Sequence, residues 1–265
     1  MDYHLHGNTS VDTKLTLKEI YDIAVQKGIK NICYTNHQEP MEFVNGKTDQ
    51  SLTPDGLARY KQEFSEVKKD SKINVYFGTE VSYNEGFEKE TNKFINENDF
   101  DFVLGSVHYA LGMHLADKRD ALKIQMQDPA KICKDYFRLL AKAIKSGMFD
   151  VIAHADLYKR KMINEPDFAL YKKQWERIAE LLKKHKVGFE INTSYKKDKY
   201  DGTYPDERII RLFVEKGVNI ITLGSDSHKP EQVGYRIDEM EKLLKSMGVK
   251  QVCIFEKRKP RFISL

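Results

Sequence analysis

The chain opens with Met1-Asp2-Tyr3-His4-Leu5-His6, and this stretch contains the feature that recurs along the rest of the sequence. The segment Tyr3–Leu5 is a short run typical of a β-strand. Because side chains alternate along a strand, His4 and His6 leave the same face of the chain. Other predicted strands end in the same kinds of residue.

Short apolar or β-branched runs predict seven strands. They are Tyr3–Leu5, Asn31–Thr35, Val75–Val81, Phe102–Val107, Val151–His154, Val187–Asn192 and Asn219–Leu223. Several are apolar nearly throughout, as in parallel strands that are covered on both faces. Between them we expect helices that begin at the capping box of Thr16 and Glu19 and at Pro54, Pro129 and Pro205.

Strands that alternate with helices favour a parallel α/β architecture, with a closed or nearly closed barrel as the natural arrangement. An open, doubly wound sheet is the alternative. The sequence has no GxGxxG or GxxxxGK[ST] loop to support a nucleotide-binding version of that sheet. No internal repeat or linker interrupts the sequence, so we expect residues 1–265 to form one domain.

The composition excludes several classes of protein. Of the 265 residues, 40% are hydrophobic and 32% are charged, which excludes global disorder. The 44 Lys and Arg residues exceed the 40 Asp and Glu residues only slightly, which suits an anionic substrate better than a nucleic acid. The three cysteines form no CxxC pair, so a disulfide framework or a thiolate zinc site is not expected. Without a signal peptide or a membrane-spanning run, we expect a soluble, cytoplasmic protein.

The histidines are informative through their placement. Six of the eight lie at or just beyond the end of a predicted strand, and two carboxylates occupy equivalent positions. These residues are His4, His6, His37, Glu80, His108, His154, Asp226 and His228. In a parallel barrel such ends converge on one mouth, where active sites are built. A single histidine there is more often a core or loop residue, but six favour metal binding. His114 and His185 lie elsewhere, and we expect neither to be a ligand.

Imidazole and carboxylate groups are the ligands of borderline divalent metals. Since one ion takes about four ligands, eight or nine indicate two or three ions with a bridging carboxylate. Clustered divalent ions without a thiolate or haem motif point to hydrolysis, especially of phosphoesters. They supply a hydroxide and neutralise the charge that develops on the phosphoryl group.

The order and spacing of these strand-end residues resemble the PHP (polymerase and histidinol phosphatase) superfamily over essentially the whole chain. The chain length, the strand end Ile191-Asn192-Thr193 and the closing Gly224-Ser225-Asp226-Ser227-His228 are similar to the stand-alone histidinol-phosphatases of histidine biosynthesis. The resemblance implies a distorted, TIM-like (β/α)7 barrel with the metal site at the C-terminal ends of the strands. It also implies hydrolysis of L-histidinol phosphate to L-histidinol and phosphate, by in-line attack of a metal-bridging hydroxide.

The resemblance further implies three divalent ions, which would be zinc or, depending on availability, manganese or iron. The first would be held by His4, His6, Glu80 and Asp226. Glu80 would bridge to a second ion, held also by His108 and His154. The third would take His37, His228 and Asp12, which stands where many relatives have His. Asn36 stands where Asp is common, and this changes the surroundings of His37 but not the ligand itself.

The resemblance does not fix the residues that bind the substrate. A phosphomonoester needs cations near the metals, and Arg binds phosphate with two parallel hydrogen bonds. We expect Arg160 to serve this role, with Lys161 and Lys197 as neighbouring cations; the alternative is that all three are solvated loop charges. Candidate acceptors for the imidazole and ammonium ends of histidinol are Glu39, Ser82, Tyr83 and Asn84. Asp226 or His228 would be the catalytic residue that assists the leaving alkoxide.

Two other functions stay open. A nuclease or nucleotide phosphatase of the same superfamily would use the same metals, but the sequence has no polymerase segment and no aromatic and basic platform for single strands. A non-catalytic, metal-stabilised scaffold would be expected to have lost ligands, whereas all nine are present. We expect a small phosphomonoester as the ligand, and neither nucleic acid nor membrane as a partner.

Overall fold

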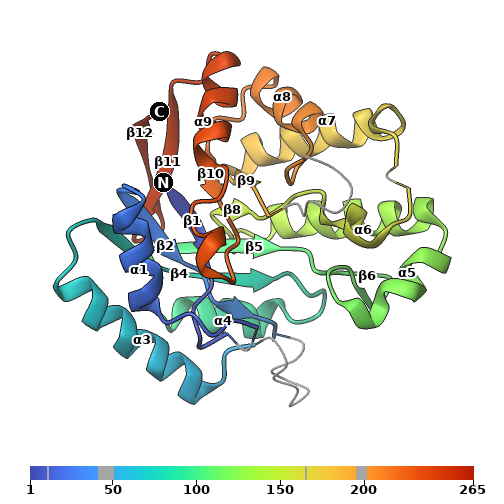
Figure 1. Ribbon diagram of the computed structural model, residues 1–265. Coiled ribbons are helices and arrows are strands. Elements are labelled where there is room, and N and C mark those ends of the chain that lie inside the picture. The colour runs from blue at the N-terminus through green and yellow to red at the C-terminus, as the bar shows by residue number, and fades with distance from the viewer. Residues whose placement is uncertain (11, 41–50, 165, 195–201) are drawn as a thin grey trace.

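The computed structural model describes residues 1–10, 12–40, 51–164, 166–194 and 202–265 (Figure 1). Its central sheet contains seven parallel strands in the order β1-β2-β4-β5-β8-β9-β10. They are β1 (Asp2–Leu5), β2 (Asn31–Tyr34), β4 (Asn74–Ser82), β5 (Phe102–Ser106), β8 (Val151–Ile152), β9 (Gly188–Asn192) and β10 (Ile221–Gly224). These are the seven strands that the sequence predicts, with ends shifted by one or two residues. A short additional strand, β3 (His37–Gln38), pairs with β4.

The sheet curves until its first and last strands meet. The N–H of His6 donates to the carbonyl of Ser227, at 3.1 Å, and the N–H of Ser227 donates to the carbonyl of His4, at 3.4 Å. These bonds join β1 to the segment that follows β10. The fold is therefore a nearly closed (β/α)7 barrel, as predicted, and not an open doubly wound sheet.

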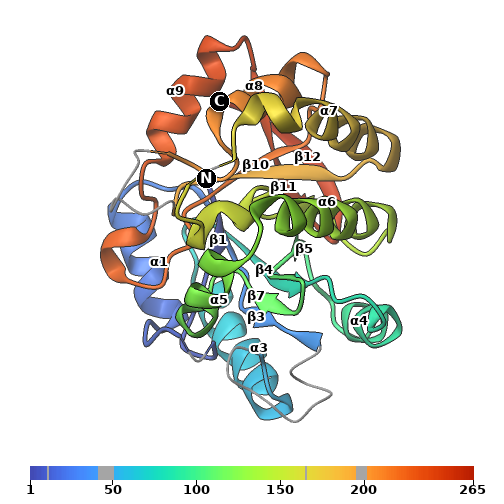
Figure 2. The ribbon, with the colours of Figure 1, turned by 90° about the vertical axis from the view of Figure 1, so that its right-hand side faces the viewer.

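Helices surround the strands, as the two perpendicular views show (Figures 1 and 2). They are α1 (Leu17–Gln26), α3 (Pro54–Lys69), α4 (Glu88–Asn96), α5 (Ala121–Met126), α6 (Pro129–Lys145), α7 (Phe168–His185), α8 (Glu207–Glu215) and α9 (Ile237–Ser246). Within the described part of the chain, no helix has the length and apolar character needed to cross a membrane.

The helices of the structure begin at the predicted caps, with one exception. Thr16 and Glu19 form the capping box of α1, and Pro54 and Pro129 stand in the first turns of α3 and α6. Pro205 does not open α8, because Asp206 follows it as the cap and accepts a hydrogen bond from the N–H of Arg208. The helix therefore starts after the aspartate, whose side chain satisfies one of the free N–H groups of the first turn.

A C-terminal hairpin that the sequence did not predict covers the N-terminal end of the barrel. It consists of β11 (Gln251–Glu256) and β12 (Lys259–Ser264). Residues of β11 pack in one apolar cluster with residues from the N-terminal halves of the strands, including Tyr3 and Phe102. The Tyr3 hydroxyl also donates to the carbonyl of Phe255 and accepts from its N–H. Since this end is filled, the C-terminal ends of the strands form the other end of the barrel, where the predicted ligands lie.

Candidate metal centre

The barrel brings the nine predicted metal ligands together at one end. His4 lies on β1 and His6 follows it, His37 lies on β3, and Glu80 lies on β4. The others follow strands: His108 after β5, His154 after β8, Asp226 and His228 after β10, with Asp12 on the loop after β1. The parallel order delivers these side chains because every strand ends at the same rim.

Glu80 lies at the centre of the cluster and contacts imidazoles with both carboxylate oxygens. Its Oε1 is 2.9 Å from Nε2 of His154 and 3.3 Å from Nε2 of His108. Its Oε2 is 2.8 Å from Nδ1 of His37 and 3.3 Å from Nε2 of His4. One carboxylate thus faces separate groups of imidazoles, which is the arrangement of a bridging ligand.

Two aspartates complete the cluster on the side away from His108 and His154. Oδ1 of Asp226 lies 3.2 Å from Nε2 of His6 and 3.6 Å from Nε2 of His4. Oδ2 of Asp12 lies 2.7 Å from Nε2 of His228 and 3.4 Å from Nε2 of His37. A cleft of about 470 Å³ reaches the cluster beside Asp12 and His228, so this part is open to solvent.

Donor atoms are close enough to share ions at four places in the described part of the chain. The sets whose donor atoms lie within 4.8 Å of one another are His4, His6 and Asp226; Glu80, His108 and His154; His6, His37 and His228; and Glu39, His108 and His114. The first two sets fall within the ligand groups predicted for the first and second ions, while the third contains His37 and His228 of the predicted third group with His6 in place of Asp12. The fourth contains two residues, Glu39 and His114, that the sequence did not predict as ligands.

The imidazole rings are in mutual contact. The ring of His6 stacks on His37 and on His228, with centroids 4.2 and 4.3 Å apart. The rings of His108 and His154 are tilted against each other, with centroids 5.3 Å apart. Nδ1 of His6 is buried without a hydrogen-bond partner among the described residues, and its Nε2 faces the Asp226 carboxylate. Rings packed this closely cannot all be protonated, because their positive charges would repel one another.

Burial and charge shift the pKa values of the cluster far from their ordinary range. Burial alone would raise the pKa of Glu80, but His4, His37 and His108 outweigh it and hold that pKa well below its usual value. Burial and the neighbouring imidazoles of His37 and His228 lower the pKa of His6 to about 3. The carboxylates therefore need positive charge that the crowded imidazoles cannot all carry. Divalent cations fit this donor set, because they balance the carboxylates while every imidazole stays neutral.

Two further carboxylates hold ligands from behind. Glu190 on β9 lies 2.6 Å from Nδ1 of His4, and Glu39 lies 2.6 Å from Nδ1 of His108. The hydroxyl of Ser82 also donates to Glu39, at 2.5 Å. Such contacts fix which ring nitrogen carries the proton and leave Nε2 free to bind a metal. The sequence signal for Glu190 was present, since a charged residue stands inside the apolar strand Phe189-Glu190-Ile191.

His114 joins the cluster, although its sequence position suggested an unrelated loop. It ends the small hairpin of β6 (Tyr109–Ala110) and β7 (Met113–His114), and its ring stacks on His108 at 5.4 Å. Its Nδ1 accepts hydrogen bonds from the N–H groups of Ala116 and Asp117, both at 3.2 Å. The proton of a neutral ring is therefore on Nε2, and neither nitrogen offers an open lone pair. This tautomer agrees with the expectation that His114 is not a ligand.

Asn36, which departs from the superfamily pattern, supports the loop after β1. Its side-chain oxygen accepts a hydrogen bond from the N–H of Gly7, at 2.7 Å, and its amide nitrogen donates to Thr9. This loop leads to Asp12. Asn36 therefore supports the loop that carries Asp12.

The predicted substrate-binding residues lie next to the cluster in sequence. Arg160 and Lys161 belong to the short 3-10 helix η2 (Leu157–Lys161), which follows His154, and both are half-buried. Their neighbour Lys159 is buried, with its ammonium 2.9 Å from Asp156. Lys197 lies outside the described residues.

The four candidate acceptors for the organic part of the substrate differ in their contacts. Glu39 and Ser82 bind each other beside His108. The Tyr83 hydroxyl donates to Glu88 of α4, at 2.8 Å, and the Asn84 amide donates to the carbonyl of Tyr83. Tyr83 is therefore directed towards α4.

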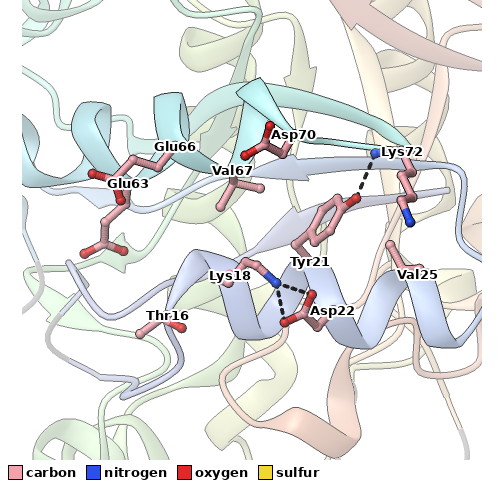
Figure 3. Close-up of a pocket in the computed structure, with 10 residues that line it drawn as sticks. All are labelled: Thr16, Lys18, Tyr21, Asp22, Val25, Glu63, Glu66, Val67, Asp70 and Lys72. Carbon is pink, nitrogen blue, oxygen red and sulfur yellow. Dashed lines mark hydrogen bonds and ion pairs between the residues drawn. The ribbon is translucent and has the colours of Figure 1, made fainter.

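A separate pocket of about 700 Å³ lies on the outside of the barrel, between α1 and α3 (Figure 3). Lys18 and Asp22 are paired with each other there, and the Tyr21 hydroxyl accepts a hydrogen bond from the N–H of Lys72 (Figure 3). None of the nine predicted ligands lines this pocket. The metal cluster is therefore the stronger candidate for the functional site.

Comparisons with known proteins find histidinol-phosphatases that match nearly the full length of the chain. The chain is 27% identical over 255 residues to a probable histidinol-phosphatase of Deinococcus radiodurans, covering 95% of each chain. It is 29% identical to a probable histidinol-phosphatase of Clostridium acetobutylicum, covering 97% of each. It is also 27% identical to a histidinol-phosphatase of Lactococcus lactis, covering 96% of this chain and 94% of that one.

Solved structures show the same fold. The histidinol phosphate phosphatase of Lactococcus lactis, solved in complex with zinc, L-histidinol and phosphate, superimposes with a TM-score of 0.82 at 23% identity and covers 98% of each chain. A putative histidinol phosphatase from Listeria monocytogenes gives a TM-score of 0.80 at 20% identity, over 90% of this chain and 98% of that one.

The barrel and its buried cluster of imidazoles and carboxylates define an α/β protein built to hold divalent metal ions. The PHP domain family matches residues 2–194, which is most of the chain. The chain belongs to the PHP domain family.

Proposed function

We propose that this protein is a metal-dependent phosphatase that hydrolyses L-histidinol phosphate to L-histidinol and phosphate. The observation that carries the proposal is the position of Glu80, whose two oxygens face separate groups of imidazoles. This arrangement suits a cluster of divalent ions, which supply an activated water and neutralise phosphoryl oxygens when bound. The histidinol-phosphatases named above match nearly the full length of the chain, and the structure with zinc, L-histidinol and phosphate has the same fold.

The proposal includes three divalent ions, which would be zinc, or manganese or iron. The residues that would hold them are the nine predicted ligands, grouped around Glu80, Asp226 and Asp12. Support comes from the three sets of donor atoms that lie within 4.8 Å and share no more than one histidine between any two sets.

The chain's own groups would bind the substrate and handle the proton. Arg160, with Lys161 and Lys197, would bind phosphate oxygens. Asp226 or His228 would assist protonation of the leaving alcohol. Asp226 is held for such a role by the Ser194 hydroxyl, which donates to its Oδ2 at 3.0 Å.

We also propose that the entire chain acts as one unit in a cytoplasmic enzyme. Strand β10 and the ligands Asp226 and His228 lie beyond residue 194, where the family match ends. They complete both the barrel and the cluster. A shorter unit would lack two of the nine ligands.

A phosphate-release assay with metal-reconstituted protein tests the function. The panel contains L-histidinol phosphate, other small phosphomonoesters, nucleoside monophosphates and single-stranded oligonucleotides. We expect kcat/KM for L-histidinol phosphate to exceed that for the others by about 100-fold or more, or about 2.7 kcal/mol. Faster turnover of nucleotides or oligonucleotides would indicate the nuclease or nucleotide phosphatase instead. No turnover of any substrate by fully loaded protein would indicate the scaffold.

A further inference from the structure

We propose that Glu190 is a positioning residue that holds one ligand from each of two neighbouring metal positions at the same time. This inference rests on the metal centre of the proposed function, but not on the identity of the substrate. His4 belongs to the first position and His154 to the second. Glu190 would fix the distance between the two positions from behind the imidazoles.

Both carboxylate oxygens of Glu190 contact predicted metal ligands, and each oxygen contacts a different one. Oε1 lies 2.6 Å from Nδ1 of His4. Oε2 accepts a hydrogen bond from the backbone N–H of His154, at 3.0 Å, and another from the Asn192 amide, at 3.1 Å. Glu190 is only 1% exposed. A carboxylate this deeply buried keeps its orientation, because any rotation would leave a charged oxygen without a donor.

The contact with His4 fixes the ring. Donation of the Nδ1 proton to Glu190 leaves the lone pair on Nε2, which is the atom a metal needs. This Nε2 lies 3.3 Å from Oε2 of Glu80. Glu190 therefore selects both the tautomer and the direction of the first ligand.

The contact with His154 fixes the backbone instead of the ring. His154 has a φ of 26°, which is unusual for a residue other than glycine and needs support from its surroundings. Its Nδ1 is buried without a hydrogen-bond partner among the described residues, so this ring has no carboxylate behind it. The N–H bond to Glu190, with the bond from the Leu157 N–H to the His154 carbonyl, thus holds the His154 backbone while its Nε2 faces Oε1 of Glu80, at 2.9 Å.

Glu80 and Glu190 consequently connect the same two histidines from opposite sides. Glu80 contacts both at Nε2, and Glu190 contacts one at Nδ1 and the other at the backbone. Space for the second carboxylate exists because residue 224 is glycine: a Cβ there would overlap with Oε1 of Glu190 and with Cβ of His4. Glu39 offers a matched comparison, because within the described part of the chain the predicted ligand that it contacts is His108.

The test is a zinc titration of chelator-stripped protein against a chromophoric competitor, for the parent, Glu190→Gln and Glu39→Gln. Loss of a contact behind a ligand typically weakens metal binding 10–100-fold. We expect Glu190→Gln to lower the zinc affinity at two metal positions by about this factor, and Glu39→Gln to lower it at one position. If Glu190→Gln weakens a single ion, or leaves all ions within about twofold of the parent, the proposal is wrong.

A second readout distinguishes positioning from packing. In zinc-loaded protein labelled with ¹⁵N-histidine, the Nδ1 proton of His4 should be protected from exchange in the parent and in Glu39→Gln. It should exchange at least about tenfold faster in Glu190→Gln, because the charged acceptor is gone. Unchanged exchange in Glu190→Gln would overturn the proposal.

Gly224→Ala provides an independent variant that displaces the carboxylate without removing it. It should weaken the same two ions as Glu190→Gln, and a different pattern would count against the proposal. If Glu190→Gln does not fold, Glu190→Asp keeps the charge with a shorter reach, and the same loss at two ions is expected. Because zinc binding is measured without substrate, a failed phosphatase assay would leave this result unaffected.

Discussion

Oδ2 of Asp12 lies 2.7 Å from Nε2 of His228, and this contact joins the loop after β1 to the loop after β10, the last strand of the barrel. The hydroxyl of Thr13 donates to the carbonyl of His228, at 2.9 Å, and strengthens the same junction. Burial alone would raise the pKa of Asp12, but His37 and His228 hold it well below its ordinary value. Asp12 would therefore be an anionic ligand at the proposed third metal position.

Replacing Asp12 tests this assignment. We expect Asp12→Ala to lose about one metal ion per chain, because it removes one of three ligands at the most exposed position of the cluster. Asp12→His should retain that ion, since an imidazole is an acceptable substitute. Elemental analysis of protein dialysed against metal-free buffer measures the difference. Equal metal content in Asp12→Ala and the parent would show that Asp12 is not a ligand.

Glu80→Ala should be among the most damaging single changes at the site. It removes the group that faces two sets of imidazoles and leaves two cations next to each other without a shared anion. We expect the metal content to fall from close to three ions per chain to one or fewer, with loss of phosphatase activity. Glu66→Ala, on the exposed face of α3, is the control and should keep the parent's metal content. A parent with one ion or fewer in an active sample would contradict the three-ion proposal.

Metal binding should release protons at neutral pH. Burial alone would lower the pKa of His108, but Glu39 and Glu80 raise it to about 9 in the metal-free protein. His108 is therefore protonated at pH 7 and must lose its proton to bind zinc, so the apparent affinity should rise with pH until about 9. Calorimetric titration at pH 7 in two buffers of different ionisation enthalpy measures the released protons. Zero net release of protons would contradict the raised pKa of His108.

The raised pKa of His108 also predicts that the metal-free protein loses stability at alkaline pH. The pKa of His108 is higher in the fold than its ordinary value of 6.5, so the charged form stabilises the fold. This contribution is fully present below pH 6.5 and is lost as the pH rises through about 9. The Tm of chelator-treated protein should therefore fall over this range. The zinc-loaded protein should change less, because His108 is already neutral there.

Much of the site was predictable because strand ends carry its ligands. His108 and His154 end short apolar runs, and parallel packing places such ends on one rim whatever the details of the helices. The seven strands were predictable for the same reason, since buried parallel strands are continuous apolar segments. Eight of the nine predicted ligands lie at or just beyond strand ends, whereas Asp12 was predicted from the family resemblance alone.

Residues that act through contacts across the barrel were not predictable. Glu190 was visible as a charge in an apolar strand, but its link to both His4 and His154 depends on how strands distant in sequence face each other. His114 reaches the cluster because a small hairpin folds back onto His108. The role of the C-terminal hairpin depends on which end of the barrel it covers. None of these relationships follows from local periodicity.

Arg160 is the first choice for phosphate binding, and its replacement tests that choice. If its guanidinium contacts the phosphate, Arg160→Ala should lower kcat/KM by about 100-fold, because the contact strengthens as charge develops on the oxygens. Arg160→Lys should recover only part of the lost kcat/KM, since an ammonium cannot form two parallel hydrogen bonds with the phosphate. Metal content should stay normal in both. A nearly silent Arg160→Ala together with a crippled Lys161→Ala or Lys197→Ala would assign the role to a neighbouring cation.

The C-terminal hairpin should contribute strongly to stability without affecting the metals. Phe255 is 2% exposed and its ring is tilted against that of Phe102, with centroids 5.1 Å apart, whereas Phe262 on the paired strand is 44% exposed. Phe255→Ala would leave a cavity in the apolar cluster that fills the N-terminal end of the barrel, at a cost of about 3–5 kcal/mol in the free energy of unfolding. Phe262→Ala, the matched control, should cost about 0.5 kcal/mol or less.

Urea unfolding of chelator-treated protein measures both values, because bound zinc would add its own stabilisation to the folded state. The metal cluster lies at the other end of the strands, so zinc binding per folded chain should be the same in both variants and the parent. Equal destabilisation by the two substitutions would mean that the hairpin does not fill the barrel end. Loss of zinc in Phe255→Ala at full folding would mean that the two ends of the barrel are coupled, and that the hairpin helps to place the strand ends that carry the ligands.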